Sequence, residues 1–245
     1  MKSQTISSSD IRVAWSERKI RPSSVTNTGK ISFKWGAQAS ESELEAGFLK
    51  LLAFDPDIAN VRSQPFTLYW PDGKGGERKY TPDVLLQYRA QLNNPSALKG
   101  HVREVKPSHI YEKHRDEFEK KFEIARIWCK AEGYDFGVIT ELSYSTAHVW
   151  NAQFLMRYGD DKLMCSTAEA KARSAKLLRA VAELGKTTPT EVLTAISSDP
   201  REWAHLLPQL WHLVCKRAIR ADFKVRLAMG SAIWPASPSF TGPAP

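Results

Sequence analysis

Four short runs of apolar, β-branched and aromatic residues lie between residues 58 and 106, and they constrain the fold more strongly than any other feature. Gly, Pro, Asn and Asp separate the runs, and runs of this length and composition are typical of strands. The glycine-rich turn between the second and third runs predicts a β-hairpin. The predicted strands cover 58–62, 66–70, 78–88 and 101–106.

Helical patterns on both sides of these runs indicate a mixed α/β sheet. Before the runs, apolar residues recur at helical spacing as far as Phe54, and Ser40 or Ser42 can cap this helix. After them we expect a long helix over 111–133 and then an apolar strand, 136–140, buried on both faces. The order helix, strands, helix, strand predicts one mixed-sheet domain spanning 39–165.

A second unit of different pattern is predicted over 166–235. Its first part has three helical stretches, two of which begin with Pro in the first turn, and its last part has two short apolar runs around Met229-Gly230. Three helices followed by a β-hairpin form the plan of an α+β winged-helix domain. The predicted helices are 167–184, 188–196 and 199–218, and the predicted strands are 223–227 and 231–234.

The two ends of the chain differ from both predicted domains. Residues 1–38 carry many Lys and Arg and no sustained period, so we expect a basic N-terminal arm, extended except for a short helix around 9–15. Residues 236–245 are rich in Pro and Ser and predict a disordered tail.

Charge is distributed unevenly along the chain. The formal net charge of +8 divides into a net +5 for residues 1–40, zero for 41–110, −2 for 111–165 and +5 for 166–245. Basic ends around a neutral centre suit a site that binds cations, flanked by segments that contact phosphates. A basic excess of this size alone is equally compatible with an ordinary soluble protein.

Membrane insertion and cysteine chemistry are both disfavoured by the sequence. No stretch approaches the roughly 20 apolar residues of a membrane span, and the polar start lacks a signal-peptide core, which predicts a cytoplasmic location with no membrane partner. Cys129, Cys165 and Cys215 are far apart, without a CxxC motif or an evident histidine pairing. We therefore expect neither a disulfide framework nor a structural zinc site.

Four polar residues fall where strand geometry can bring them together. Asp83 follows Pro82 just ahead of an apolar strand, and Glu104 and Lys106 alternate along the next strand, so they project to the same face. Glu45, on the preceding helix, can complete the group, although spacing alone leaves Glu41 and Glu43 as rivals. Any one of these residues alone is more often an ordinary surface charge; the ordered set is more specific.

Phosphodiester cleavage requires a set of this kind. Carboxylates bind Mg²⁺ or Mn²⁺, which prefer oxygen ligands, and we expect two ions held by Asp83, Glu104, Glu45 and the backbone carbonyl of Val105. The metal neutralises the charge that builds on the phosphate, and Lys106 can stabilise the same charge or orient the attacking water. The sequence thus predicts a metal-dependent endonuclease with catalytic residues Glu45, Asp83, Glu104 and Lys106.

Candidate DNA contacts are found in two places. Gln64 can contact the hydrated metal or DNA, or it can simply end a strand. A basic cluster at the end of the third helix of the second unit can contact the DNA backbone or dock a protein partner, and the sequence leaves both open. The cluster consists of Lys216, Arg217, Arg220, Lys224 and Arg226.

An ordered set of short motifs resembles the TnsA-type endonucleases, subunits of heteromeric Tn7-like cut-and-paste transposases. The motifs are LE at 44–45, SQPF at 63–66, YTPD at 80–83, ExKP at 104–107 and VITE at 138–141. The segments RKIRPSS (18–24) and WNAQFLMRYG (150–159) also look like that family, so the resemblance extends over nearly the whole chain.

The resemblance implies both a fold and a role. It implies a restriction-endonuclease-like PD-(D/E)xK domain followed by a winged helix, and it selects Glu45 as the first acid. It also implies that Glu104 tolerates change better than Asp83, because some members carry Gln there. The implied activity is cutting of transposon 5′ ends in a bacterial cell. The implied partners are transposon-end DNA, a DDE-type TnsB-like transposase subunit and a TnsC-like AAA+ ATPase.

Two other functions remain open on the sequence. A stand-alone restriction or repair nuclease of the same fold would cleave DNA without partners. A winged-helix DNA-binding regulator with a vestigial nuclease half would take up no Mg²⁺ or Mn²⁺, although the intact Asp83, Glu104 and Lys106 set argues against it.

Overall fold

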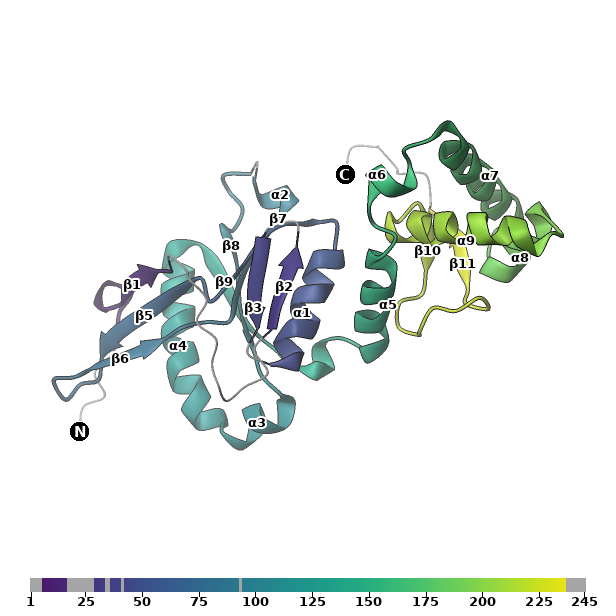
Figure 1. Cartoon of the computed structure of the whole chain (residues 1–245). Coiled ribbons are helices and arrows are strands. Elements are labelled where there is room, and N and C mark those ends of the chain that lie inside the picture. Colours follow the sequence, from purple (N-terminus) through teal and green to yellow (C-terminus); the bar gives the residue numbers. More distant parts are fainter. Residues whose placement is uncertain (1–5, 17–28, 34–35, 41, 93, 237–245) are drawn as a thin grey trace, which may run out of the picture. The chain divides into compact units, whose positions relative to one another are not determined.

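The computed structural model describes residues 6–16, 29–33, 36–40, 42–92 and 94–236. It divides the chain into two compact units, Met1–Tyr144 and Ser145–Pro245 (Figure 1). The division falls well before the predicted domain boundary at residue 165, because the helix that begins at Thr146 packs within the second unit. The predicted tail, apart from residue 236, and much of the predicted arm lie outside the described residues.

The first unit is a mixed α/β structure. Its helices and strands are η1 (Ser8–Asp10), β1 (Arg12–Trp15), β2 (Gly29–Phe33), β3 (Gly36–Ser40), α1 (Glu43–Phe54), β4 (Ile58–Ser63), β5 (Phe66–Pro71), β6 (Glu77–Tyr80), β7 (Val84–Tyr88), α2 (Arg89–Leu92), β8 (Gly100–Val105), α3 (Ser108–Lys113), α4 (Arg115–Glu132), β9 (Tyr134–Ile139) and η2 (Glu141–Ser143). The predicted helix before the strands is confirmed, and Ser42 is its cap: its hydroxyl accepts a hydrogen bond from the amide of Glu45.

A four-stranded sheet of order β4-β7-β8-β9 is the centre of this unit. The first three strands are antiparallel, and β8 and β9 are parallel, so the sheet is mixed as predicted. A second sheet, of order β1-β5-β6, contains the predicted hairpin around the glycine-rich turn. The strands β2 and β3 form a separate antiparallel pair.

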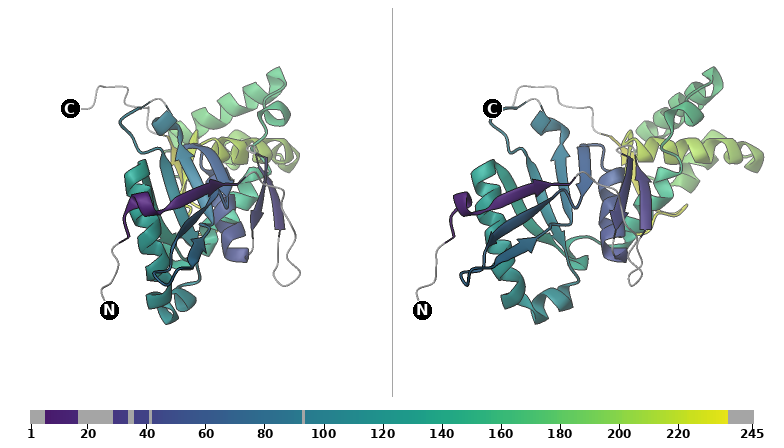
Figure 2. Two further views of the ribbon diagram at one scale, coloured as in Figure 1. Left: turned by 90° about the vertical axis from the view of Figure 1, so that its left-hand side faces the viewer. Right: turned by 60° about the vertical axis from the view of Figure 1, so that its left-hand side comes forward.

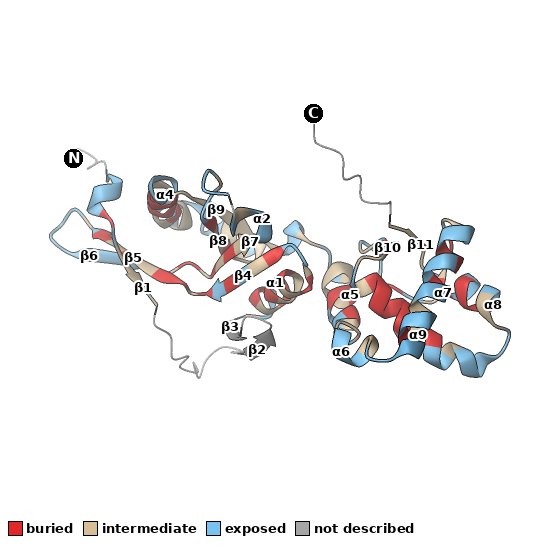
Figure 3. Cartoon of the chain, turned by 90° about the horizontal axis from the view of Figure 1, so that it is seen from above, coloured by how far each residue is buried: buried red, intermediate tan, exposed pale blue. Residues whose placement is uncertain are grey.

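Two hydrophobic clusters cover opposite faces of the four-stranded sheet. Helix α1 packs through Phe48, Leu49 and Leu52 against Val84 and Val105. Helix α4 packs on the other face, where buried aromatic residues predominate; this cluster includes Phe66, Tyr80, Val102, Phe122 and Trp128. Figures 1 and 2 show the two helices on either side of the sheet, and Figure 3 shows that the buried side of each helix is the one facing it.

Three local predictions for this unit are wrong. The helix predicted around 9–15 is limited to η1, and Arg12–Trp15 forms β1 instead, because its apolar residues alternate and Trp15 packs its ring on Phe66, 5.1 Å between centroids. The single strand predicted over 78–88 is interrupted between β6 and β7. Strand β9 is half-buried throughout rather than buried on both faces, since it is the edge strand of its sheet.

The predicted long helix 111–133 is divided at His114, whose backbone is non-helical, into α3 and α4. The bend brings the ring of Tyr111 to within 6.1–6.3 Å of the rings of Phe118 and Phe122. Gly133 ends α4 in the left-handed conformation, at φ 79°, as expected for a glycine after a helix.

The second unit is mainly helical. It contains α5 (Thr146–Met156), α6 (Asp161–Met164), α7 (Ala168–Leu184), α8 (Pro189–Ile196), α9 (Pro200–Cys215), β10 (Ile219–Ala221) and β11 (Ile233–Pro235). The three predicted helices correspond to α7, α8 and α9, capped by Thr167, Thr188 and Asp199. Among the described residues, no helix is both long and apolar enough to cross a membrane.

The first strand of the second unit lies outside its predicted range, 223–227, whereas the second, β11, overlaps the predicted 231–234. Ile219–Ala221 pairs with Ile233–Pro235, whereas 223–227 forms a loop. The buried side chain of Asn151 explains the loop: its amide nitrogen donates to the carbonyls of Phe223 and Val225 at 3.2 and 2.7 Å, and its oxygen accepts from the amide of Leu227 at 2.8 Å. Hydrogen bonds to a side chain therefore replace those of a strand partner.

We predict that Asn151→Ala destabilises the second unit by about 3 kcal/mol, because it leaves the buried amide of Leu227 and two half-buried carbonyls without these partners. Urea unfolding monitored by circular dichroism measures the change. Gln153→Ala removes an exposed amide from the same helix and should change the unfolding free energy by less than about 0.5 kcal/mol. Equal effects of the two substitutions would contradict this account of the loop.

Candidate active site

The pairing of β7 with β8 places Asp83 beside Glu104. The strands are antiparallel with Val84 opposite Arg103, so the residue before Val84 faces the residue after Arg103. The carboxylate Oδ2 of Asp83 accepts a hydrogen bond from the amide of Val105 at 2.7 Å, and its carbonyl accepts from the amide of Gln64 at 2.7 Å. Asp83 is thus held by backbone groups of both neighbouring segments.

The ammonium group of Lys106 contacts oxygen atoms of three other residues of the site. Its Nζ lies 3.1 Å from Glu104 Oε1 and 3.3 Å from Asp83 Oδ2, and it donates to the carbonyl of Val105 at 3.2 Å. The predicted same-face projection of Glu104 and Lys106 is confirmed by the first of these contacts. Two carboxylates and one carbonyl therefore direct oxygen atoms at a single positive charge.

Glu104 is the most deeply buried charged group of the site, 2% exposed. Burial raises the pKa of its carboxyl to about 7, and the nearby charge of Asp83 adds to the rise, while Lys106 and the Tyr80 hydroxyl oppose it. Burial lowers the pKa of Lys106, but Glu104 and Asp83 outweigh it and the net shift is upward. Lys106 therefore carries its charge at neutral pH. The Glu104 carboxyl, with its pKa of about 7, is partly protonated there.

Tyr80 is a member of the site that the sequence analysis missed. Its hydroxyl donates to Glu104 Oε2 at 2.6 Å, and the ring lies in the buried cluster under α4. Burial, followed by the charge of Glu104, raises the pKa of Tyr80 well above its usual value, so the hydroxyl stays protonated and can donate. The sequence feature that could have pointed to Tyr80 is its position three residues before Asp83, where β6 ends.

Glu45 lies in the first turn of α1. Its carboxylate accepts a hydrogen bond from the Ser42 hydroxyl at 3.2 Å. Glu45 is 9% exposed, whereas Glu43 is exposed to solvent and Glu41 lies outside the described residues. Burial favours Glu45 over Glu43 as the first acid, because a carboxylate kept from water requires a partner. The helix packs on Val84 and Val105, next to the other site residues.

Gln64 adopts a backbone conformation that is rare for its residue type. Its φ of 45° lies in the left-handed region, between the end of β4 and Pro65. Its amide donates to the carbonyl of Asp83, so this conformation joins the β4–β5 connection to the candidate site. Strained backbone of this kind is concentrated at functional sites, and the DNA or metal contact of Gln64 stays a prediction.

The basic residues predicted to bind DNA in the second unit have varied surroundings. Lys216 forms an ion pair with Asp161 at 2.9 Å. Arg217 and Arg226 stack on Phe223 and Trp150, with the guanidinium carbon 4.3 and 5.7 Å from the ring centroids. Arg220 and Lys224 are exposed. The choice between DNA and a protein partner stays open for this cluster.

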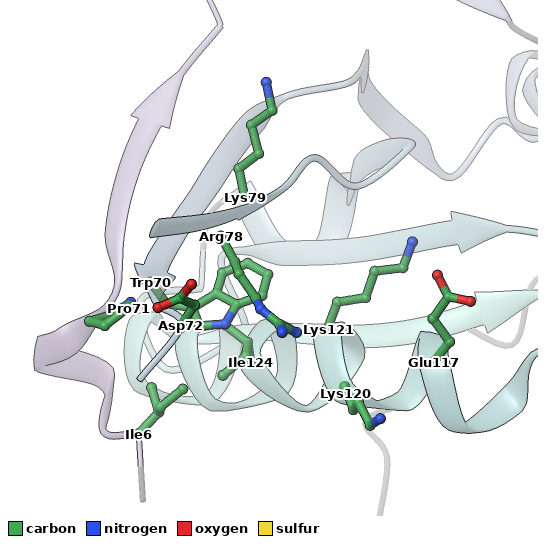
Figure 4. A pocket seen from close by; sticks show the side chains of 10 residues that line it. All are labelled: Ile6, Trp70, Pro71, Asp72, Arg78, Lys79, Glu117, Lys120, Lys121 and Ile124. Atoms are coloured by element: carbon green, nitrogen blue, oxygen red, sulfur yellow. The ribbon is translucent and has the colours of Figure 1, made fainter. Parts of the chain in front are cut away.

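A basic pocket in the first unit was not predicted. It has a volume of about 490 Å³ and lies between β6 and α4, as Figure 4 shows. Lys120 and Lys121 of α4 line it together with Arg78 and Lys79 of β6. The Lys121 ammonium lies 5.3 Å from the centroid of the Tyr80 ring, so the pocket adjoins the residue that holds Glu104. The acidic residues of its lining are Asp72 and Glu117.

The comparison with protein families bears on this site. Residues 55–141 match the family described as TnsA-like endonuclease N terminal. The matched segment contains Asp83, Glu104 and Lys106, covers less than half of the chain, and excludes Glu45 and the second unit. No curated protein matches the chain. The match supports a TnsA-like nuclease with a restriction-endonuclease-like fold, in agreement with the mixed sheet.

Proposed function

We propose that this chain is a metal-dependent DNA endonuclease that cuts the 5′ ends of a transposon together with a DDE-type transposase subunit. The observation that carries the proposal is the convergence of Asp83, Glu104 and Val105 oxygens on one ammonium group. The family match to a TnsA-like endonuclease domain supports the nuclease chemistry. The transposon-specific role rests on the motif resemblance, and a winged helix in the second unit is part of the same proposal.

The donor set fits a divalent cation. Mg²⁺ and Mn²⁺ prefer carboxylate and carbonyl oxygens, and the Lys106 ammonium marks a position that three such oxygens already surround. Asp83, Glu104 and the Val105 carbonyl would hold a first ion, and Glu45 would contribute to a second. When bound, the ions supply positive charge that stabilises the phosphate during cleavage and favours ionisation of the attacking water.

The protein's own residues have separate tasks in this proposal. The Val105 amide fixes Asp83 Oδ2, and the Tyr80 hydroxyl fixes Glu104 Oε2, so both carboxylates are oriented before a ligand arrives. Lys106 forms ion pairs with both carboxylates in the free protein. A cation at the oxygens would release its ammonium to contact a phosphate oxygen or the attacking water.

Metal binding should depend on pH between 6 and 8. Glu104 has a pKa of about 7, so below pH 7 it is mostly protonated, and a metal must displace that proton. We expect Mg²⁺ affinity to fall by about tenfold from pH 8 to pH 6 and a fractional proton to be released per site at pH 7. Calorimetric titration in two buffers of different ionisation enthalpy measures both; a pH-independent affinity without proton release would contradict the assignment of Glu104.

The basic pocket is proposed to contact DNA phosphates. We expect Arg78→Ala with Lys120→Ala to weaken DNA binding and to reduce the slope of log affinity against log salt by about 2, one for each lost phosphate contact. Fluorescence anisotropy at several salt concentrations measures the slope. The double variant Lys113→Ala and Lys130→Ala, which removes two exposed lysines elsewhere on α3 and α4, should leave the slope unchanged. Equal slopes for the wild type and both double variants would exclude the pocket as a contact for DNA phosphates.

A direct test of the proposed function is metal uptake combined with cutting of transposon-end DNA. Mn²⁺ bound at the Asp83 and Glu104 oxygens would be located by anomalous scattering from crystals of the full chain. Absence of bound Mn²⁺ would favour a DNA-binding regulator with a vestigial nuclease half. Cleavage by the pure protein without partners would favour a stand-alone nuclease.

A further inference from the structure

A second cluster of metal-ligating side chains lies in the second unit. Ligand atoms of Asp161, Cys165 and His212 all lie within 4.8 Å of one another. His212 Nε2 is 3.2 Å from Cys165 Sγ and 3.6 Å from Asp161 Oδ1. The prediction that the cysteines lack a histidine partner is therefore wrong for Cys165. Its partner is 47 residues away in the sequence, so spacing did not reveal it.

The imidazole of His212 is already oriented for a ligand at Nε2. His212 is 3% exposed on α9, and its Nδ1 lies 2.7 Å from the carbonyl of Tyr158. A carbonyl only accepts hydrogen bonds, so Nδ1 carries the hydrogen and Nε2 is directed at Cys165 and Asp161. Histidines that bind metals commonly donate their other ring N–H to a carbonyl or carboxylate in this way.

The other two ligands come from one short segment. Asp161 begins α6 and Cys165 follows its end, and the amide of Cys165 donates to the carbonyl of Asp161 at 2.8 Å. This turn places the thiol and the carboxylate on the same side, against α9. Asp161 is exposed, Cys165 is half-buried and His212 is buried, so the cluster is closed on the protein side and open toward solvent.

We propose that Asp161, Cys165 and His212 bind a transition-metal ion of the Zn²⁺ class. One sulfur, one imidazole nitrogen and one carboxylate oxygen suit Zn²⁺ or Co²⁺ and disfavour Mg²⁺, which prefers oxygen alone. On binding, the Cys165 thiol loses its proton to solvent and coordinates as thiolate. Three protein ligands leave the fourth position of a tetrahedral site to water.

Lys216 sets the electrostatic conditions for this site. Its ammonium lies 2.9 Å from the same Asp161 oxygen that faces His212. In the metal-free protein it neutralises the carboxylate; with metal bound, the charge of the Cys165 thiolate and Asp161 together balances the ion. The bound ion would connect α6 to the end of α9 within the second unit, independent of the nuclease carboxylates.

Cobalt binding by the full-length chain tests the proposal. Co²⁺ is titrated into metal-free, reduced protein, and absorption is recorded in the near ultraviolet, where only thiolate-bound Co²⁺ gives an intense charge-transfer band. We expect one Co²⁺ per chain with this band, and its loss when Zn²⁺ is added. Cys165→Ala should abolish the band, and His212→Gln should weaken Co²⁺ binding by at least about tenfold.

Matched variants separate this site from others. Cys215→Ala removes another half-buried thiol of the same unit and should keep the band, and Asp83→Ala should keep it too, because the nuclease carboxylates supply no sulfur. Circular dichroism confirms that each variant is folded. No charge-transfer band in the wild type, or a band that survives Cys165→Ala, would overturn the proposal whatever the outcome of the nuclease assays.

Discussion

Replacement of Asp83 by alanine should lower the rate of 5′-end cutting by at least about a thousandfold, equivalent to about 4 kcal/mol of transition-state stabilisation. Asp83 contributes one of the three oxygens around the Lys106 ammonium, and its Oδ2 also accepts the Val105 amide. Alanine removes both contacts, so a cation bound at the proposed site would lose a ligand. Quantitative cleavage of end-labelled transposon-end DNA in the presence of the partner subunits measures the effect.

The Asp83→Ala variant should still assemble with its partners and DNA, because the substitution lies inside the candidate site and not on an exposed surface. Gel-filtration of the complex checks this. Asp116→Ala, which removes an exposed aspartate at the start of α4, is the matched control and should cut within about twofold of the wild type. Retained cutting by Asp83→Ala would overturn the site assignment.

Replacement of Lys106 by alanine should separate metal binding from cleavage. The ammonium occupies the position that Asp83, Glu104 and the Val105 carbonyl surround, so its removal takes away a competitor for the cation. We therefore expect Mg²⁺ affinity to be unchanged or higher. Cleavage should nevertheless fall by about a hundredfold to a thousandfold, because the positive charge next to the phosphate is lost.

Calorimetry for Mg²⁺ and the cleavage assay, run on the same Lys106→Ala preparation, give the two quantities. Lys113→Ala, an exposed lysine on α3, should change neither. A parallel loss of metal affinity and cleavage would mean that Lys106 supports the structure of the site and has no separate part in the chemistry.

The sequence predicted the sheet and the pairing of its polar residues because both follow from local rules. Alternation along a strand places Glu104 and Lys106 on one face whatever the rest of the chain does. The cap of α1 is similarly local, and Ser42 was one of two candidates. The family match now supports the nuclease domain over residues 55–141.

The features that the sequence did not reveal depend on contacts between distant segments. Tyr80 reaches Glu104 across 24 residues, and Cys165 reaches His212 across 47, and no periodicity records such pairs. The first strand of the second unit was misplaced for a related reason. The buried Asn151 of helix α5 forms hydrogen bonds with backbone groups of 223–227. An apolar run that is typical of a strand therefore remains a loop.

The central proposal is tested most directly by mapping the cut on each strand of a labelled transposon end. The assay is run with and without Mg²⁺ and with and without the transposase partner. The account predicts a cut confined to the 5′ end of the element, which requires Mg²⁺ or Mn²⁺ and the partner and is abolished by Asp83→Ala. A cut that persists in chelator, or that Asp83→Ala retains, would contradict it.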